Sequence, residues 1–176
     1  MPIPRKITIL ILLFALAVMA AMAYANWPRH ALQPGIKADH VVVLKSERKM
    51  ILLSSHAVLR EYAISLGSNP VGNKVREGDG RTPEGSYRID YRNPKSMAHL
   101  ALHISYPKAD DVARAKQQGV PPGGSIMIHG LSNGYGVLGR LHRWYDWTDG
   151  CIAVSNDEIE EIWRVVPDGT PIDIRA

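Results

Sequence analysis

The segments SIMIHG (residues 125–130) and DWTDGCIAVSNDEIEEIW (residues 146–163) decide how the rest of the chain is interpreted. The first segment delivers His129 after a short apolar run, and the second holds the only cysteine of the chain, Cys151. A thiol attacks as the thiolate, and a histidine that the fold brings close can remove its proton. This pair predicts cysteine nucleophilic catalysis. A buried structural cysteine is the competing interpretation.

The residues beside Cys151 suit a nucleophile. Gly150 would let the backbone come close to a substrate carbonyl. The run from Ser155 to Glu158 is a capping box, and the apolar residues after it recur at helical spacing, so a helix with one apolar face is expected there. The N-terminus of this helix is expected to lower the thiol pKa, and adjacent backbone N–H groups could form an oxyanion hole. The carbonyl of Gly130 is the expected partner that fixes the tautomer of His129.

Outward from these segments, short apolar runs predict a mainly β domain. Runs rich in Val, Ile and Leu, divided by polar breaks, are typical of the strands of a meander. The expected strands are 40–44, 49–53, 58–66, 86–90, 99–105, 126–128 and 170–174. A long glycine-rich loop is expected over 67–85, and a short helix over 109–118. Many short strands with few helices indicate a β-sandwich or an open barrel.

The N-terminus has the composition of an export signal. Arg5 and Lys6 precede an apolar run over 7–22, and a small-x-small sequence follows at 23–25. These are the positive region, the apolar region and the cleavage site of a signal peptide. Because the run also has nearly the length that spans a bilayer, cleavage at its end and an uncleaved anchor over 7–25 both stay open. Both interpretations predict export of the remainder to the periplasm or cell envelope.

The chain is expected to have three parts. Residues 1–25 form the signal peptide or signal anchor, 26–38 a linker, and 39–176 a single domain of ordinary size. The formal net charge of +4 falls to +2 without residues 1–25, because that segment carries two cations and no acid. A mildly basic domain without a Lys/Arg stripe is not expected to bind nucleic acid. Contact with a membrane is expected only through the N-terminal segment.

The cysteine and histidine content limits the site further. A lone cysteine cannot close an internal disulfide, and an unpaired thiol in an exported protein indicates either chemistry or burial. The seven histidines form no compact ligand cluster in the sequence. Neither a metal site nor an organic cofactor is therefore expected.

Four motifs of the chain belong together: Leu66-Gly67 with Pro70, GDGRTPEGSY at 78–87, SIMIHG at 125–130, and Thr148-x-Gly150-Cys151. Taken together they resemble the L,D-transpeptidase catalytic domain, the YkuD-like family of cell-wall enzymes. The resemblance covers about residues 39–176. It implies a β-sandwich-like fold with a short helix after the cysteine, preceded by the N-terminal apolar helix. It also implies attack by the cysteine on a peptidoglycan stem peptide, with no cofactor.

The resemblance assigns roles by position. Cys151 would be the nucleophile, His129 the general base and Gly130 the carbonyl that orients it, while Gly150 and Cys151 would supply oxyanion N–H groups. The thioester formed from a tetrapeptide donor would pass to an amine of a second stem peptide, a wall-attached protein or an amino acid. Resolution by water would instead make a peptidoglycan L,D-carboxypeptidase or amidase. A catalytically silent wall-binding module is the alternative from another class of function.

The sequence departs from the family pattern next to the nucleophile. Asp149 stands where the family usually has histidine, and the arginine common two residues after the cysteine is alanine. Twenty-one residues separate His129 from Cys151, more than is usual. A carboxylate beside the thiol would raise its pKa. Asp149 is therefore expected to point away, where it would cap a turn, pair with Arg140 or Arg143, or hold a substrate ammonium.

Three more residues, with Asp149, are candidates for substrate binding. Arg81 could hold a substrate carboxylate through two parallel hydrogen bonds. His142 could replace the missing histidine in space, and Trp147 could wall the cleft. The ordinary alternatives are a solvated arginine, a surface loop histidine and a tryptophan that only packs the loop.

Overall fold

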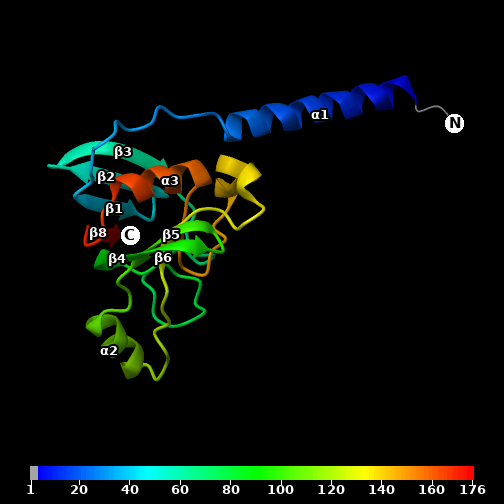
Figure 1. Cartoon of the computed structure of the whole chain (residues 1–176). Coiled ribbons are helices and arrows are strands. Elements are labelled where there is room, and N and C mark those ends of the chain that lie inside the picture. Colours follow the sequence, from blue (N-terminus) through cyan, green and yellow to red (C-terminus); the bar gives the residue numbers. More distant parts are fainter. Residues whose placement is uncertain (1–3) are drawn as a thin grey trace.

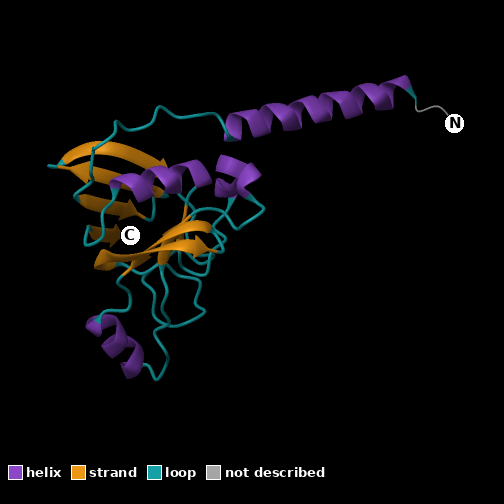
Figure 2. Ribbon diagram, viewed as in Figure 1, coloured by secondary structure: helices purple, strands orange, loops and turns teal. Residues whose placement is uncertain are grey.

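The computed structural model describes residues 4–176, and the domain that follows the N-terminal helix is built around one curled β-sheet (Figures 1 and 2). The strand order across this sheet is β3-β2-β1-β8-β4-β5-β6-β7. The strands are β1 (His40–Leu44), β2 (Lys49–Ser54), β3 (Ala57–Ala63), β4 (Gly85–Ser96), β5 (His99–Ile104), β6 (Met127–His129), β7 (Ile152–Ala153) and β8 (Pro171–Arg175). The mainly β architecture expected from the apolar runs is confirmed.

The last strand of the chain joins the two parts of the sheet. β8 is parallel to β1 on one side and antiparallel to β4 on the other. The meander β1 to β3 lies beyond β1, while β5, β6 and β7 follow β4. Because β6 ends in His129 and β7 begins directly after Cys151, the two segments that carry these residues are neighbours at one end of the sheet.

Two strand boundaries differ from the expectation. β3 ends at Ala63 rather than at residue 66, because Ser65 leaves the ladder with β2 and pairs with Ala153. β4 continues to Ser96 rather than ending at residue 90, because it pairs first with β8 and then with β5. The second half of β4 is polar and its burial does not alternate, so apolar periodicity could not reveal it.

Four helical segments lie within residues 4–176. They are α1 (Arg5–Ala25), α2 (Ala109–Gln117), the 3₁₀ segment η1 (Gly136–Trp144) and α3 (Asn156–Val165). α3 begins with the expected capping box, in which the Ser155 N–H donates to Glu158 Oε2 at 3.1 Å. η1 has no counterpart among the expected elements, because Gly139 inside it has non-helical backbone angles and interrupts any helical period.

The apolar core lies between the curled sheet and α3. It takes Val41 and Val43 from β1, and Ile159 and Ile162 from the buried face of α3. β6 and β7 contribute Ile128 and Ile152 to the same core. Each fully buried aliphatic side chain of this size contributes about 1.5–3 kcal/mol to folding. The strands that carry the candidate site are therefore fixed by the core rather than by loops.

Glu158 connects α3 to two segments that are distant in sequence. Its nearly fully buried carboxylate accepts a hydrogen bond from Arg143 of η1 and forms an ion pair with Arg29 at 3.2 Å. Burial alone would raise the pKa of Glu158, but the hydrogen bond and charge of Arg143 outweigh burial and lower this pKa. In the same linker, the Leu32 N–H donates to Glu161 Oε1 at 2.8 Å. Residues of the 26–38 segment thus lie against α3.

α1 extends away from the sheet, and only its C-terminal end lies beside the domain (Figure 1). Its side chains are exposed along most of its length, whereas Ala25 at the end is buried. Within the described residues, α1 is the one helix long and apolar enough to cross a membrane, judged by length and composition.

Candidate active site

The register of β6 and β7 places His129 and Cys151 on one face of the sheet. Ile128 lies opposite Ile152, and His129 lies opposite Ala153. Both isoleucines are fully buried in the core. Because side chains alternate between the faces of a strand, His129 and Cys151, each one residue from an isoleucine, lie on the other face. The fold therefore brings together the two residues that the sequence singled out.

The His129 ring is held by its own neighbour in the chain. Its Nδ1 donates to the carbonyl oxygen of Gly130 at 2.6 Å, which is the contact expected from the sequence. With the proton on Nδ1, the lone pair is on Nε2. Burial lowers the pKa of His129, although the Gly130 carbonyl opposes this. At neutral pH the ring is an uncharged imidazole with one nitrogen able to accept a proton.

The pKa of the Cys151 thiol is raised, which corrects the expectation that a helix N-terminus would lower it. Burial is the main cause and the charge of Asp149 adds to it, against a backbone hydrogen bond from Met127 and the charge of Lys74. α3 begins only at Asn156, so its N-terminus does not outweigh burial. The thiol is partly exposed, and Sγ lies 3.7 Å from the Ser125 carbonyl oxygen.

The resting pair is therefore a neutral thiol beside a neutral imidazole. Within residues 4–176 no hydrogen bond joins the His129 ring to Sγ, which instead lies near the Ser125 carbonyl oxygen and the Met127 backbone. Catalytic hydrogen bonds often tighten only when substrate binds. The chemistry that this arrangement allows is proton removal from the thiol during attack, rather than attack by a preformed thiolate–imidazolium pair.

This electrostatic arrangement predicts how the thiol reacts with pH. A thiol whose pKa lies above the ordinary value is protonated through the neutral range and ionises only above it. The alkylation rate of Cys151 by iodoacetamide is expected to rise continuously from pH 6 to pH 9, as mass spectrometry of the intact chain can measure. A rate that is already on a plateau between pH 5 and pH 7 would show an ion pair and contradict the neutral pair.

The backbone before Cys151 is shaped by Thr148 and Gly150. Thr148 Oγ1 donates to the Cys151 carbonyl oxygen at 2.8 Å and accepts from the Gly150 N–H at 3.2 Å. Gly150 has φ +123°, and a Cβ there would lie 2.5 Å from the Arg81 carbonyl oxygen. Only glycine fits this position. Its N–H, one of the two expected oxyanion donors, is bound to Thr148 in the resting structure.

The glycine-rich loop over 67–85 contains a buried ion pair. Lys74 is 3% exposed and donates to Asp79 Oδ1 at 2.8 Å. Burial acts to raise the pKa of Asp79, but this hydrogen bond and those from three backbone N–H groups lower it to about 2. Lys74 is near enough that its charge acts on the Cys151 thiol. Sequence reasoning missed Lys74, since a single lysine in a polar loop carries no pattern.

Arg81 is bound to other residues of the protein, whereas Asp149 faces solvent. Arg81 belongs to the same loop; its Nη1 donates to the Asn73 carbonyl oxygen at 3.4 Å, and its own carbonyl packs against Gly150. Asp149 is exposed beside the nucleophile. The expected alternative of an ion pair between Asp149 and either Arg140 or Arg143 is wrong. Arg140 pairs with Asp157 and Arg143 with Glu158, because α3 presents its first-turn acids to η1.

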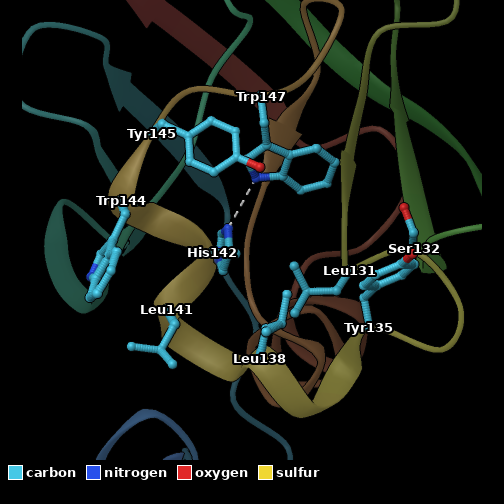
Figure 3. A pocket seen from close by; sticks show the side chains of 9 residues that line it. All are labelled: Leu131, Ser132, Tyr135, Leu138, Leu141, His142, Trp144, Tyr145 and Trp147. Carbon is cyan, nitrogen blue, oxygen red and sulfur yellow. Dashed lines mark hydrogen bonds between the residues drawn. The ribbon is translucent and has the colours of Figure 1, made fainter. Parts of the chain in front are cut away.

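His142 is buried, which corrects its interpretation as a surface histidine. It is 6% exposed on η1, and burial followed by the charge of Arg143 lowers its pKa to about 4. Trp147 Nε1 donates to His142 Nδ1 at 3.4 Å (Figure 3). The Trp147 ring also meets the His129 ring edge to face, with centroids 5.7 Å apart. Trp147 therefore links His142 to the candidate base.

A cavity of about 430 Å³ opens on the η1 side of Trp147 (Figure 3). It is lined by Leu131, Ser132, Tyr135, Leu138, Leu141, His142, Trp144, Tyr145 and Trp147. Most of these side chains are aromatic or aliphatic, and the polar His142 Nε2 is buried without a hydrogen-bond partner among the described residues. Trp147 is thus both a packing residue of the loop and a wall between this cavity and His129.

Comparisons with known proteins identify relatives of this domain. A family model described as YkuD, the L,D-transpeptidase catalytic domain, matches residues 38–174. An Escherichia coli K12 protein with the name "Putative L,D-transpeptidase YafK" is 29% identical over 133 residues, which cover 72% of this chain and 46% of that protein. The chain thus spans about half the length of the curated relatives that it matches.

Solved structures share the fold. The helical cell shape determining protein Pgp2 from Campylobacter jejuni aligns with a TM-score of 0.60 and 25% identity, over 88% of this chain and 54% of that chain. An L,D-transpeptidase from Xylanimonas cellulosilytica aligns with a TM-score of 0.51 and 15% identity, over 84% and 65% of the two chains. At that identity the second likeness concerns the fold alone.

Proposed function

Because the chain belongs to the L,D-transpeptidase catalytic domain family, we propose that it is an exported enzyme that transfers peptidoglycan stem peptides through a thioester on Cys151. The observation that carries this proposal is the pairing of β6 with β7, which sets His129 and Cys151 on the same face of the sheet. The buried His129 ring, fixed by the Gly130 carbonyl, offers Nε2 as the base. The N-terminal apolar helix supports export.

The first half-reaction forms the thioester. Nε2 of His129 takes the Sγ proton as sulfur attacks the carbonyl carbon of the donor peptide bond. The resulting oxyanion is stabilised by the N–H of Cys151 and by that of Gly150, which exchanges its bond to Thr148 for the substrate. As the tetrahedral intermediate collapses, the imidazolium returns its proton to the leaving amine, and the acyl group stays on sulfur.

The second half-reaction releases the acyl group. An acceptor amine attacks the thioester carbonyl, His129 takes the proton from that amine, and the Cys151 thiolate leaves and is reprotonated. With the thiol pKa raised and the imidazole neutral, the base is needed in both halves. A positioned general base of this kind contributes about 10²–10⁴ in rate.

Charged groups around the thiol suit a stem peptide, which carries carboxylates and the ammonium of a diamino acid. Arg81 of the glycine-rich loop is the candidate partner for a donor carboxylate, since its own carbonyl packs against Gly150. Asp149 is exposed beside the nucleophile and is free to hold a substrate ammonium. Trp147 would pack against the peptide next to His129.

Product masses test this function. We expect the full chain, incubated in detergent with disaccharide tetrapeptides, to yield cross-linked dimers that mass spectrometry detects, with release of the terminal D-alanine. A Cys151→Ala chain supplies the background. Trimmed monomers without dimers would instead show hydrolysis of the thioester, that is, a carboxypeptidase. Binding of muropeptides without any product would show a silent wall-binding module and contradict the proposal.

A further inference from the structure

The C-terminal end of α1 is fitted to η1. A Cβ at Gly139 of η1 would lie 2.6 Å from the Ala25 carbonyl oxygen, so the two segments touch through backbone. Asn26 Nδ2 donates to the Val137 carbonyl oxygen at 2.9 Å, and Arg140 Nη2 donates to the Trp27 carbonyl oxygen at 2.8 Å. The domain lies beyond the end of α1, with η1 beside that end (Figure 1).

Large apolar side chains are exposed around this junction. We call the set the η1 face; it consists of Tyr24, Trp27, Tyr135, Val137, Leu138, Trp144 and Tyr145. Trp144 is the most exposed of them, at 84%. Soluble monomers rarely expose clustered apolar side chains of this kind. Tryptophan and tyrosine are the residues enriched where a membrane protein crosses the headgroup region.

The charges of η1 do not oppose contact with lipid. Arg140 is paired with Asp157, and Arg143 is paired with the buried carboxylate of Glu158. The guanidinium groups therefore enter no apolar layer without a counter-ion. The face that remains toward solvent is formed by aromatic and aliphatic groups.

The length and the terminal charges of α1 indicate that a lipid bilayer covers the η1 face. Its 21 residues would span about 31 Å at 1.5 Å per residue, which matches a hydrocarbon core of about 30 Å. Arg5 and Lys6 at its start favour an orientation with the C-terminal end outside. A bilayer crossed by α1 would end where the η1 face begins.

We propose that α1 is retained as a membrane anchor and that the η1 face lies in the headgroup layer of the bilayer that α1 spans. The proposal concerns location and does not depend on whether Cys151 reacts. η1 lies in the connection from His129 to Cys151, and Trp147 joins its cavity to the His129 ring. The bilayer contact thus fixes the candidate site close to the membrane surface.

Fluorescence quenching tests the contact. The full chain is reconstituted into phosphatidylcholine vesicles whose acyl chains are brominated near the headgroup, and tryptophan quenching is measured. We expect Trp144→Phe to lose a clear share of the quenching. Trp163→Phe is the matched control, since Trp163 lies on α3 under Arg92 and is not one of the exposed residues of the η1 face, so its replacement should leave the quenching unchanged. Equal quenching in wild type and Trp144→Phe would overturn the proposal.

Two further measurements test whether α1 is retained and whether a second copy of the protein, instead of lipid, covers the η1 face. Intact mass spectrometry of the protein extracted from cell membranes is expected to find residues 1–25 present; a chain that begins at Asn26 would overturn retention. Sedimentation in detergent is expected to give a monomer for both wild type and Trp144→Phe. A wild-type dimer that Trp144→Phe dissociates would show that a second copy, and not lipid, covers the η1 face.

Discussion

Replacing Cys151 with serine is expected to abolish the covalent acyl-enzyme, with turnover of a tetrapeptide falling below about one thousandth of the wild-type value. The hydroxyl of serine is far less acidic than a thiol, and a neutral imidazole such as His129 cannot generate useful alkoxide from it without the full support of a serine-enzyme site. Intact mass after incubation with a carbapenem or a tetrapeptide measures the adduct directly. An adduct that persists at another residue would remove Cys151 as the nucleophile, and full turnover through an ester on the substituted serine would contradict the need for a thiol.

The pH dependence of the acylation rate distinguishes the role of His129 from that of the thiol. His129→Gln keeps a buried polar side chain but removes the base, so acylation at pH 7 is expected to slow by about 10²–10⁴. At a pH above the raised thiol pKa, the thiolate forms without a base, and the deficit should shrink. His56→Gln is the matched control, since His56 is an exposed turn residue between β2 and β3. A deficit of equal size at every pH would assign His129 a structural role only.

Local sequence patterns predicted those helices and strands that form because of residues close to one another in the chain. The apolar runs predicted β1, β2 and β6, and the capping residues predicted α3, because strand alternation and helix capping act within a few residues. The second half of β4, the 3₁₀ segment η1 and the docking of the linker on α3 were not predictable in this way. Each is determined by partners far along the chain, such as Glu158 for Arg29 and Arg143.

The candidate site shows the same division. The proximity of His129 and Cys151 and the contact of His129 with Gly130 followed from motifs that stand in the sequence. The direction of the thiol pKa, the burial of His142 and the partners of the arginines on η1 were wrong, because burial and ion pairing are set by tertiary packing. Lys74 was missed for the same reason, since nothing near it in the sequence indicates that its charge acts on the thiol.

Gly150→Ala is expected to lower the stability of the fold strongly, because both its backbone angle and its surroundings exclude a Cβ. The new Cβ would need φ +123° and would lie 2.5 Å from a backbone carbonyl, that of Arg81. Strain of this kind costs about 1–3 kcal/mol, and overpacking against backbone adds about 1–3 kcal/mol. The free energy of unfolding, measured with urea on the full chain in detergent, should fall by about 3 kcal/mol or more.

Substitutions at two other glycines separate the cost of backbone strain from the cost of steric collision. At Gly169, with φ +87°, a Cβ would have no neighbour within 4 Å, so Gly169→Ala should lose only about 1 kcal/mol from strain. At Gly124, where φ is ordinary and the space is open, alanine should change the free energy of unfolding by less than about 0.5 kcal/mol. Because Gly150 precedes Cys151, its displacement should also slow acylation, whereas the two controls should not. Equal stability of Gly150→Ala and Gly169→Ala would show that the Arg81 backbone moves aside without cost. The packing of the 67–85 loop against Gly150 would then not be what fixes the backbone at the nucleophile.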